Sequence, residues 1–88
     1  MTKKKTPRDT KLYQLLDART IVYVGISKDV DRRTEQHKRD GRIHFTGSKE
    51  ISPKLSRQSA ERLETQKIQA YQSAHGGIGP KYNRRKLK

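Results

Sequence analysis

The strongly apolar residues of this 88-residue chain are concentrated in one stretch, residues 12–26. Hydrophobic residues make up only 28% of the chain, and a chain this short can bury only a modest fraction of its surface. The core must therefore form around this stretch, with a contribution from a second apolar group in residues 60–71. We expect one domain over residues 11–85, with basic tails over residues 1–10 and 86–88.

The apolar stretch predicts two strands, residues 12–16 and residues 21–26. The second is rich in β-branched and aromatic residues, which favour strands. The polar residues 17–20 between them have the length of a hairpin turn. Because apolarity is nearly continuous over residues 21–26, we predict that this strand is central in its sheet and covered on both faces.

A helix is predicted to follow the second strand. It should start at Ser27 or Lys28, run to about Asp40 and stop at Gly41, since glycine readily takes the backbone conformation that ends a helix. Carboxylates favour the first turn of a helix because of its dipole, and two acidic residues stand there, Asp29 and Asp31.

The second half of the chain predicts two more elements. Residues 42–51 form a weak candidate strand, which Gly47 interrupts and Pro53 ends. A second helix is predicted over residues 57–73, with Ser56 as its N-cap.

The charge of the chain points to a polyanionic partner. Its 22 lysines and arginines against 9 acidic residues give a net charge of +13, which favours nucleic acid. A membrane-surface helix would carry large apolar side chains, yet Trp is absent and Phe45 is the single phenylalanine. No apolar run approaches the roughly 20 residues that cross a bilayer. The lack of cysteine excludes disulfides and thiol catalysis and fits a reducing compartment.

The first predicted helix carries polar residues on the face that should dock. Its one strongly apolar residue is Val30, and Arg33 and His37 fall on the same face by helical spacing. Docking through Val30 therefore brings an arginine and a histidine towards the sheet. Arginine presents a planar fork of donors that suits phosphate oxygens.

The second predicted helix carries a carboxylate within its apolar stripe. Glu64 falls inside the stripe, whereas Glu61 lies nearer the solvent side; the stripe consists of Ala60, Leu63, Lys67, Ile68 and Tyr71. A carboxylate held out of water needs a partner, which could be a protein cation or a metal ion.

Each of these residues also has an ordinary interpretation. Glu64 could pair with Lys67 on the helix flank, Arg33 could pair with Asp29, and His37 could be a surface histidine. Together, however, an inward-facing arginine, a histidine and a carboxylate beside a tyrosine-bearing sheet are more typical of an active site than of a core.

Two tyrosine motifs sharpen this interpretation. Lys11-Leu12-Tyr13 stands ten residues before Tyr23-Val24-Gly25, and ten more residues lead to Arg33. This arrangement resembles the amino half of the GIY-YIG nuclease domain. The first motif departs from Gly-Ile-Tyr at its first two positions and keeps the tyrosine, and the second is a common form of Tyr-Ile-Gly.

The remaining matches extend the resemblance over residues 11–85. Arg33 falls on the catalytic arginine of the family and His37 on its frequent helix histidine. Glu64 resembles the metal-binding glutamate, and Asn83 the asparagine near the end of the domain. The resemblance implies an α/β chain of the α+β type, in which a small, three-stranded, mainly antiparallel sheet is flanked by helices.

The resemblance also implies an activity. The chain would be a metal-dependent endonuclease that hydrolyses DNA phosphodiester bonds. Glu64 would hold one Mg²⁺ or Mn²⁺ ion and Arg33 would stabilise charge on the phosphate, with His37 also in the catalytic set. Tyr13 or Tyr23 would activate the water, with Tyr13 favoured as the base. Because a free tyrosine has a pKa of about 10, nearby positive charge would have to lower it.

The other implied roles concern structure and DNA binding. Gly25 and Asn83 would be structural residues near the site. Contacts with the DNA backbone, which carry no sequence information, are expected from Lys28, Arg32, Lys38, Arg39, Arg84 and Arg85. The partner would be double-stranded or branched DNA. The chain has no room for the recognition domain of larger family members, so a further DNA-recognition subunit or a homodimer could assist it.

Two alternatives remain at this point. Composition alone favours a non-catalytic basic nucleic-acid-binding protein, and the same fold could serve as an inactive DNA-binding subunit. A cytoplasmic, nucleoid-associated location fits the composition, and a glycine-rich loop before Asn83 is similar to the effector-toxin branch of the family, which would be delivered as an effector domain.

Overall fold

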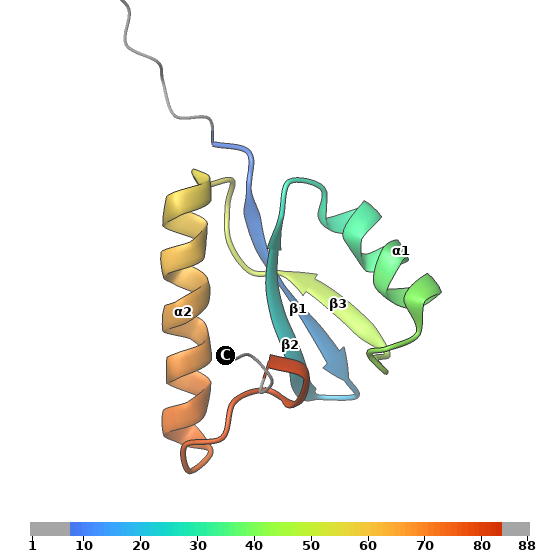
Figure 1. Cartoon of the computed structure of the whole chain (residues 1–88), viewed down its shortest axis with the longest axis vertical. Helices are drawn as coiled ribbons and strands as arrows, with labels where there is room; N and C mark the ends of the chain where they lie inside the picture. The colour runs from blue at the N-terminus through green and yellow to red at the C-terminus, as the bar shows by residue number, and fades with distance from the viewer. Residues whose placement is uncertain (1–7, 84–88) are drawn as a thin grey trace, which may run out of the picture.

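The computed structural model describes residues 8–83 (Figure 1). Along the chain it contains β1 (Lys11–Asp17), β2 (Thr20–Ser27), α1 (Val30–Asp40), β3 (Gly47–Glu50), α2 (Arg57–Ala74) and the short 3-10 helix η1 (Lys81–Asn83). The predicted three-stranded antiparallel sheet with two flanking helices is confirmed. Residues 1–7 of the predicted N-terminal tail, the whole predicted C-terminal tail, and the predicted DNA contacts Arg84 and Arg85 lie outside the described residues.

The strand order is β2-β1-β3, with both pairings antiparallel. The prediction that residues 21–26 form the central strand is wrong, because β1 is central and β2 lies at an edge. The continuous apolarity of β2 reflects cover on its two faces, where buried Val22 and Val24 belong to separate clusters. Cover on the faces does not determine whether a strand is paired along both edges.

The pairing of β1 with β2 is interrupted by a bulge. Leu15 lies opposite Tyr23 and Leu16 opposite Ile21, so Val22 is an extra residue on β2. A bulge of this kind breaks the strict alternation of side chains. Accordingly, Val22 joins the same buried cluster as Leu15, and Tyr23 packs against that cluster.

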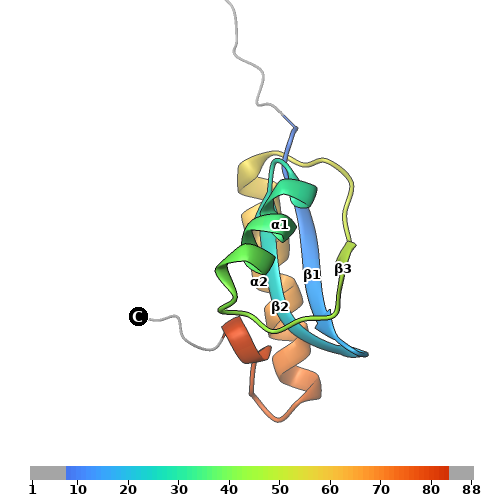
Figure 2. The ribbon, with the colours of Figure 1, turned by 90° about the vertical axis from the view of Figure 1, so that its right-hand side faces the viewer.

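The two helices cover opposite faces of the sheet (Figures 1 and 2). On the α1 side, the buried cluster consists of Tyr13, Leu15, Val22 and Val30. On the α2 side, it consists of Leu12, Val24 and Ala60. Neighbouring residues of β1 thus serve different clusters, as the alternation of side chains along a strand requires.

Local capping sets the ends of α1. The helix begins at Val30 rather than at Ser27 or Lys28, because the carboxylate of Asp29 accepts a hydrogen bond from the Arg32 N–H and so acts as the N-cap. The predicted stop at Gly41 is confirmed. Gly41 has a φ of 72°, and its N–H donates to the His37 carbonyl.

The second half of the chain follows the prediction with two corrections. Ser56 caps α2 by accepting from the Ser59 N–H, as expected. The predicted strand over residues 42–51 shortens to β3, which begins at Gly47 rather than being broken there. Lys67, assigned to the apolar stripe of α2, is exposed. Over residues 8–83, neither helix combines the length and apolarity needed to cross a bilayer.

Candidate active site

Two tyrosines from adjacent strands form the centre of the site. Tyr13 on β1 is fully buried, Tyr23 on β2 is half-buried, and their ring centroids lie 6.1 Å apart. Gly25 lies opposite Tyr13 in the sheet, and a Cβ there would stand 2.7 Å from Tyr23 Cε2 and 2.8 Å from the Tyr13 hydroxyl oxygen. The glycine therefore leaves the space that both phenols occupy.

His37 of α1 closes over this pair. The ring nitrogen Nε2 of His37 lies 2.9 Å from the Tyr13 hydroxyl oxygen, and the His37 ring meets the Tyr23 ring edge-on with centroids 5.3 Å apart. The prediction that docking through Val30 brings His37 to the sheet is confirmed, since both residues contact the α1 face of the sheet. The phenolic O–H of Tyr13 can donate to a neutral His37.

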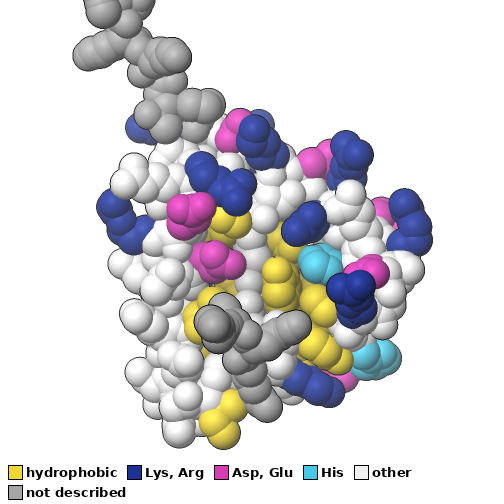
Figure 3. All heavy atoms as spheres, in the orientation of Figure 1, with side chains coloured by type: hydrophobic (Ala, Val, Ile, Leu, Met, Phe, Trp, Pro, Cys, Tyr) yellow, Lys and Arg dark blue, Asp and Glu magenta, His cyan; other side chains and the backbone are white. Residues whose placement is uncertain are grey.

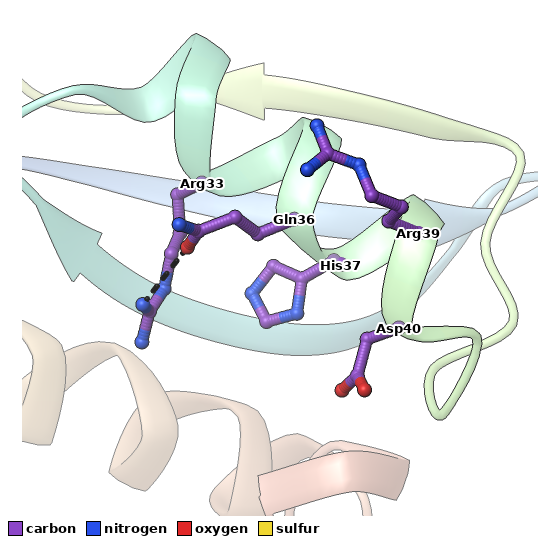
Figure 4. Close-up of a pocket in the computed structure, with 5 residues that line it drawn as sticks. All are labelled: Arg33, Gln36, His37, Arg39 and Asp40. Carbon is purple, nitrogen blue, oxygen red and sulfur yellow. Dashed lines mark hydrogen bonds between the residues drawn. The ribbon is translucent and has the colours of Figure 1, made fainter.

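Arg33 stands one turn before His37 and remains exposed. Its Nη1 donates to the Gln36 side-chain oxygen at 3.3 Å, and this bond is drawn in Figure 4. In the same view the Arg33 side chain extends from α1 past β2, on the side where α2 lies. The positive charge of Arg33 acts on both tyrosines.

Glu64 reaches the same region from α2. It is half-buried within the apolar stripe, as predicted, whereas Glu61 is exposed and pairs with Arg57 at 3.2 Å. The Glu64 carboxylate acts electrostatically on Tyr23. Because α1 and α2 cover opposite faces, their side chains can approach one another only around an edge of the sheet. The edge position of β2 is what brings residues of both helices to Tyr23.

The electrostatics of the tyrosines differ from the sequence-based expectation. Burial raises the pKa of Tyr13 well above its ordinary value of 10, and the neighbouring Tyr23 adds to the increase. Burial also raises the pKa of Tyr23, and the carboxylate of Glu64 adds to it. Arg33 opposes both shifts without cancelling them. Both phenols are therefore neutral at physiological pH.

The pKa of His37 moves in the opposite direction. Burial lowers it below the ordinary value of 6.5, and the charge of Arg33 lowers it further, whereas Asp40 raises it. The imidazole is therefore neutral at neutral pH. A neutral imidazole beside a protonated phenol is a pair in which the phenol donates a proton and the imidazole can accept it.

Glu64 suits an ion that needs few protein ligands. No three His, Cys, Asp or Glu side chains within residues 8–83 gather as a ligand group. A zinc site with several protein ligands would need such a group. Mg²⁺ instead keeps several waters and uses one or two carboxylates together with substrate oxygens. The half-buried carboxylate of Glu64, which acts electrostatically on Tyr23 from α2, fits the second case.

Asn83 fastens the free edge of β2 next to the tyrosines. Its side-chain oxygen accepts from the Val24 N–H at 2.8 Å, and its side-chain nitrogen donates to the Val24 carbonyl at 3.1 Å. Val24 lies between Tyr23 and Gly25, so the amide takes up hydrogen-bonding groups that an edge strand leaves unpaired. The side chain of Asn83 thus holds backbone rather than a ligand.

The predicted DNA-contacting residues of α1 lie on its exposed surface. Arg32, Lys38 and Arg39 are all exposed there, and Lys28 lies in the loop that precedes the helix. Weak surface ion pairs involve Lys28 with Asp9 at 3.8 Å and Lys38 with Glu35 at 4.0 Å. In Figure 3 basic side chains gather over the α1 side of the visible face, around a histidine and an apolar strip.

Two clefts adjoin His37. The first, about 480 Å³, is lined by Arg33, Gln36, His37, Arg39 and Asp40, the residues drawn in Figure 4. The second, about 540 Å³, is bounded on one side by Tyr23 and His37, and its other walls consist of Asp40, Arg42, Ile43, Lys81 and Tyr82. Sequence reasoning missed these other walls, because their proximity to His37 depends on where the loop after α1 and η1 pack.

Comparisons of the chain with protein-family models, with curated proteins and with solved structures found no match.

Proposed function

We propose that this chain is a DNA endonuclease of the GIY-YIG type. The observation that carries the proposal is the meeting of two tyrosines and a histidine from three elements, with the charges of Arg33 and Glu64 acting on them from opposite helices. Burying polar groups in a core costs free energy, and here Tyr23 and His37 also open onto a cleft. A strongly basic chain that places it beside an open cleft is suited to a phosphodiester substrate.

The reaction is hydrolysis, in which water oxygen forms a bond to phosphorus, one P–O ester bond breaks, and the water proton must be taken up. Tyr23 is half-buried and lines the second cleft, where it can contact a water. Tyr13 is completely buried, which is at odds with direct contact between its hydroxyl and that water. Their raised pKa values disfavour a lasting phenolate. A proton passed from the water through the phenols can be accepted by His37, which is neutral and lies 2.9 Å from the Tyr13 hydroxyl oxygen; because its pKa is lowered, His37 would then release the proton to solvent or to the leaving oxygen.

The second requirement for hydrolysis is a group that stabilises the negative charge on the phosphate. Arg33 is exposed at the cleft, where its guanidinium can reach phosphoryl oxygens and stabilise the negative charge that grows in the transition state. Glu64 would hold one Mg²⁺ or Mn²⁺ ion. When bound, such an ion supplies Lewis-acid stabilisation of the phosphate and the leaving oxygen.

The exposed cations of α1 would position the DNA. Arg32, Lys38 and Arg39 lie on the helix that carries Arg33 and His37, so phosphate contacts along it would place the backbone over the cleft. Contacts of this kind fix the register of the DNA but do not read its bases. We therefore expect weak sequence specificity.

The direct test replaces Glu64 by glutamine, which keeps the shape of the side chain and removes its charge. Supercoiled plasmid is incubated with the wild type and with Glu64→Gln in Mg²⁺ or Mn²⁺, and again in EDTA. We expect metal-dependent nicking by the wild type, no nicking by Glu64→Gln, and nearly equal DNA binding by both. Glu61→Gln is the matched control, because Glu61 is exposed on the same helix and should leave nicking unchanged. Nicking by Glu64→Gln at the wild-type rate would refute the assignment.

The same experiment separates this proposal from a non-catalytic nucleic-acid binder, which the net charge of +13 would also suit. A pure binder retards the plasmid in a gel and leaves it supercoiled under every metal condition.

A further inference from the structure

The second of the two clefts adjoins the candidate catalytic groups, and its walls beyond Tyr23 and His37 have no role in the mechanism above. It shares Tyr23 and His37 with that site and continues towards η1, where Lys81 and Tyr82 form its far wall. Asp40, at the end of α1, also lines it, and Figure 4 shows the Asp40 side chain extending towards η1. Any ligand in this cleft would therefore lie next to the reacting phosphate.

The far wall is held in place by contacts of its own. The Tyr82 ring packs against the buried cluster on the α1 side, and its hydroxyl accepts a hydrogen bond from the His44 N–H at 3.3 Å. Asn83, the next residue, is fastened to both polar groups of Val24. The cleft is thus a formed feature of the fold.

The lining combines groups that one class of ligand uses together. Tyr82 and Ile43 offer aromatic and apolar surface, and the Lys81 ammonium lies 5.3 Å from the Tyr82 ring centroid. Arg42 adds a second cation and Asp40 an acceptor. A bare phosphate would not need the apolar surface, and an apolar ligand would not need the cations. A nucleotide uses both, because its base stacks on aromatic rings and its phosphate is drawn to cations.

We propose that this cleft binds one unstacked nucleotide adjacent to the scissile phosphate. The volume of about 540 Å³ lies in the range of pockets that enclose small-molecule ligands. A base inside a continuous duplex cannot enter such a cleft without leaving its stack, and this costs least where the base is already unpaired. This role of the cleft rests on the proposed nuclease function. The substrate class would then be DNA with an unpaired nucleotide next to the cut, as at a branch or flap.

The first test measures binding in EDTA, so that it does not depend on cleavage. Its probes are the single-stranded octanucleotide dT8 and an octamer of abasic residues with the same phosphates, compared at one salt concentration. We expect the wild type to bind dT8 about tenfold more tightly, the size of one base–aromatic stack. Tyr82→Leu should abolish this preference. Tyr82→Phe should keep it, although it loses the same hydrogen bond from His44.

Two further measurements keep the test decisive if Tyr82→Leu folds poorly. Tyr71→Leu removes an aromatic ring that stacks on His75, away from the cleft, and should retain the preference for dT8. In the wild type, the NMR signals of the Ile43 methyl groups should shift with dT8 and not with the abasic octamer. Equal affinity for the two octamers, or unchanged Ile43 signals, would overturn the proposal.

A cleavage assay then compares a fully paired duplex with the same duplex carrying one unpaired nucleotide. We expect kcat/KM to favour the unpaired substrate by about tenfold in the wild type and in Tyr82→Phe, and not in Tyr82→Leu. Equal cleavage of both substrates by the wild type would overturn the proposal. If no DNA is cut, the proposed nuclease function fails, and the binding comparison in EDTA still decides whether the cleft takes a base.

Discussion

The packing around Gly25 makes a prediction that does not depend on the proposed activity. Alanine at this position would place its Cβ 2.7 Å from Tyr23 Cε2, 2.8 Å from the Tyr13 hydroxyl oxygen and 2.9 Å from Tyr13 Cζ. Real Cβ atoms essentially never come within 3.0 Å of such neighbours. Since Tyr13 is fully buried, its ring has no solvent space into which it can move. Gly25 is not among the positive-φ glycines of residues 8–83, so the penalty is steric.

The expected cost follows from overpacking of a formed core, which destabilises by about 1–3 kcal/mol. For a domain of this size, each 1 kcal/mol lowers Tm by about 4–8 °C. We therefore expect Gly25→Ala to lower Tm by roughly 8–16 °C for a cost of about 2 kcal/mol. The displaced phenols should also reduce any metal-dependent nicking by more than the loss of folded protein explains.

Thermal and urea unfolding followed by circular dichroism would measure this cost. Gly47→Ala is the matched control, because Gly47 is also a strand glycine and a Cβ there meets no atom within 4 Å. We expect that variant to stay within about 0.5 kcal/mol of the wild type. Equal stability of the two alanine variants would refute the argument that Gly25 makes room for the tyrosines.

Three further outcomes are expected. Burial lowers the pKa of His37 below its ordinary 6.5, so its contribution to stability is present above about pH 6.5 and is lost as the pH falls through the lower folded value. In urea titrations His37→Gln should flatten that acid decline, and an unchanged slope would contradict the assignment. Asn83→Ala loses both hydrogen bonds to the edge of β2 and should lower the free energy of unfolding by about 1–3 kcal/mol in the same urea titrations. A change under about 0.5 kcal/mol would contradict this role of Asn83. Replacing Arg32 and Arg39 by glutamine should make the plot of log K for DNA binding against log salt concentration shallower, by about 0.9 for each DNA phosphate that these arginines neutralise. Arg57→Gln on α2 should leave this slope unchanged.

Features that depend on neighbouring residues could be predicted from the sequence. The stop of α1 at Gly41 and the cap of α2 at Ser56 rest on hydrogen bonds made within one helical turn, and both are confirmed. The start of α1 was missed by two positions or more, because several polar residues in a row could serve as the cap and Asp29 is the one that does. The half-buried position of Glu64 follows from helical periodicity, which is also local.

By itself, the amino-acid sequence determined where β1, β2, α1 and α2 form, and which faces of α1 and α2 carry His37 and Glu64, because capping and periodicity act over a few residues. Only the tertiary structure decided that β2 lies at an edge, that Val22 bulges out of register, and that η1 returns to line a cleft with His37. These features depend on pairings between residues far apart in the chain. Strand order is set by competition for hydrogen bonds along strand edges, about which the apolar pattern on the faces says nothing.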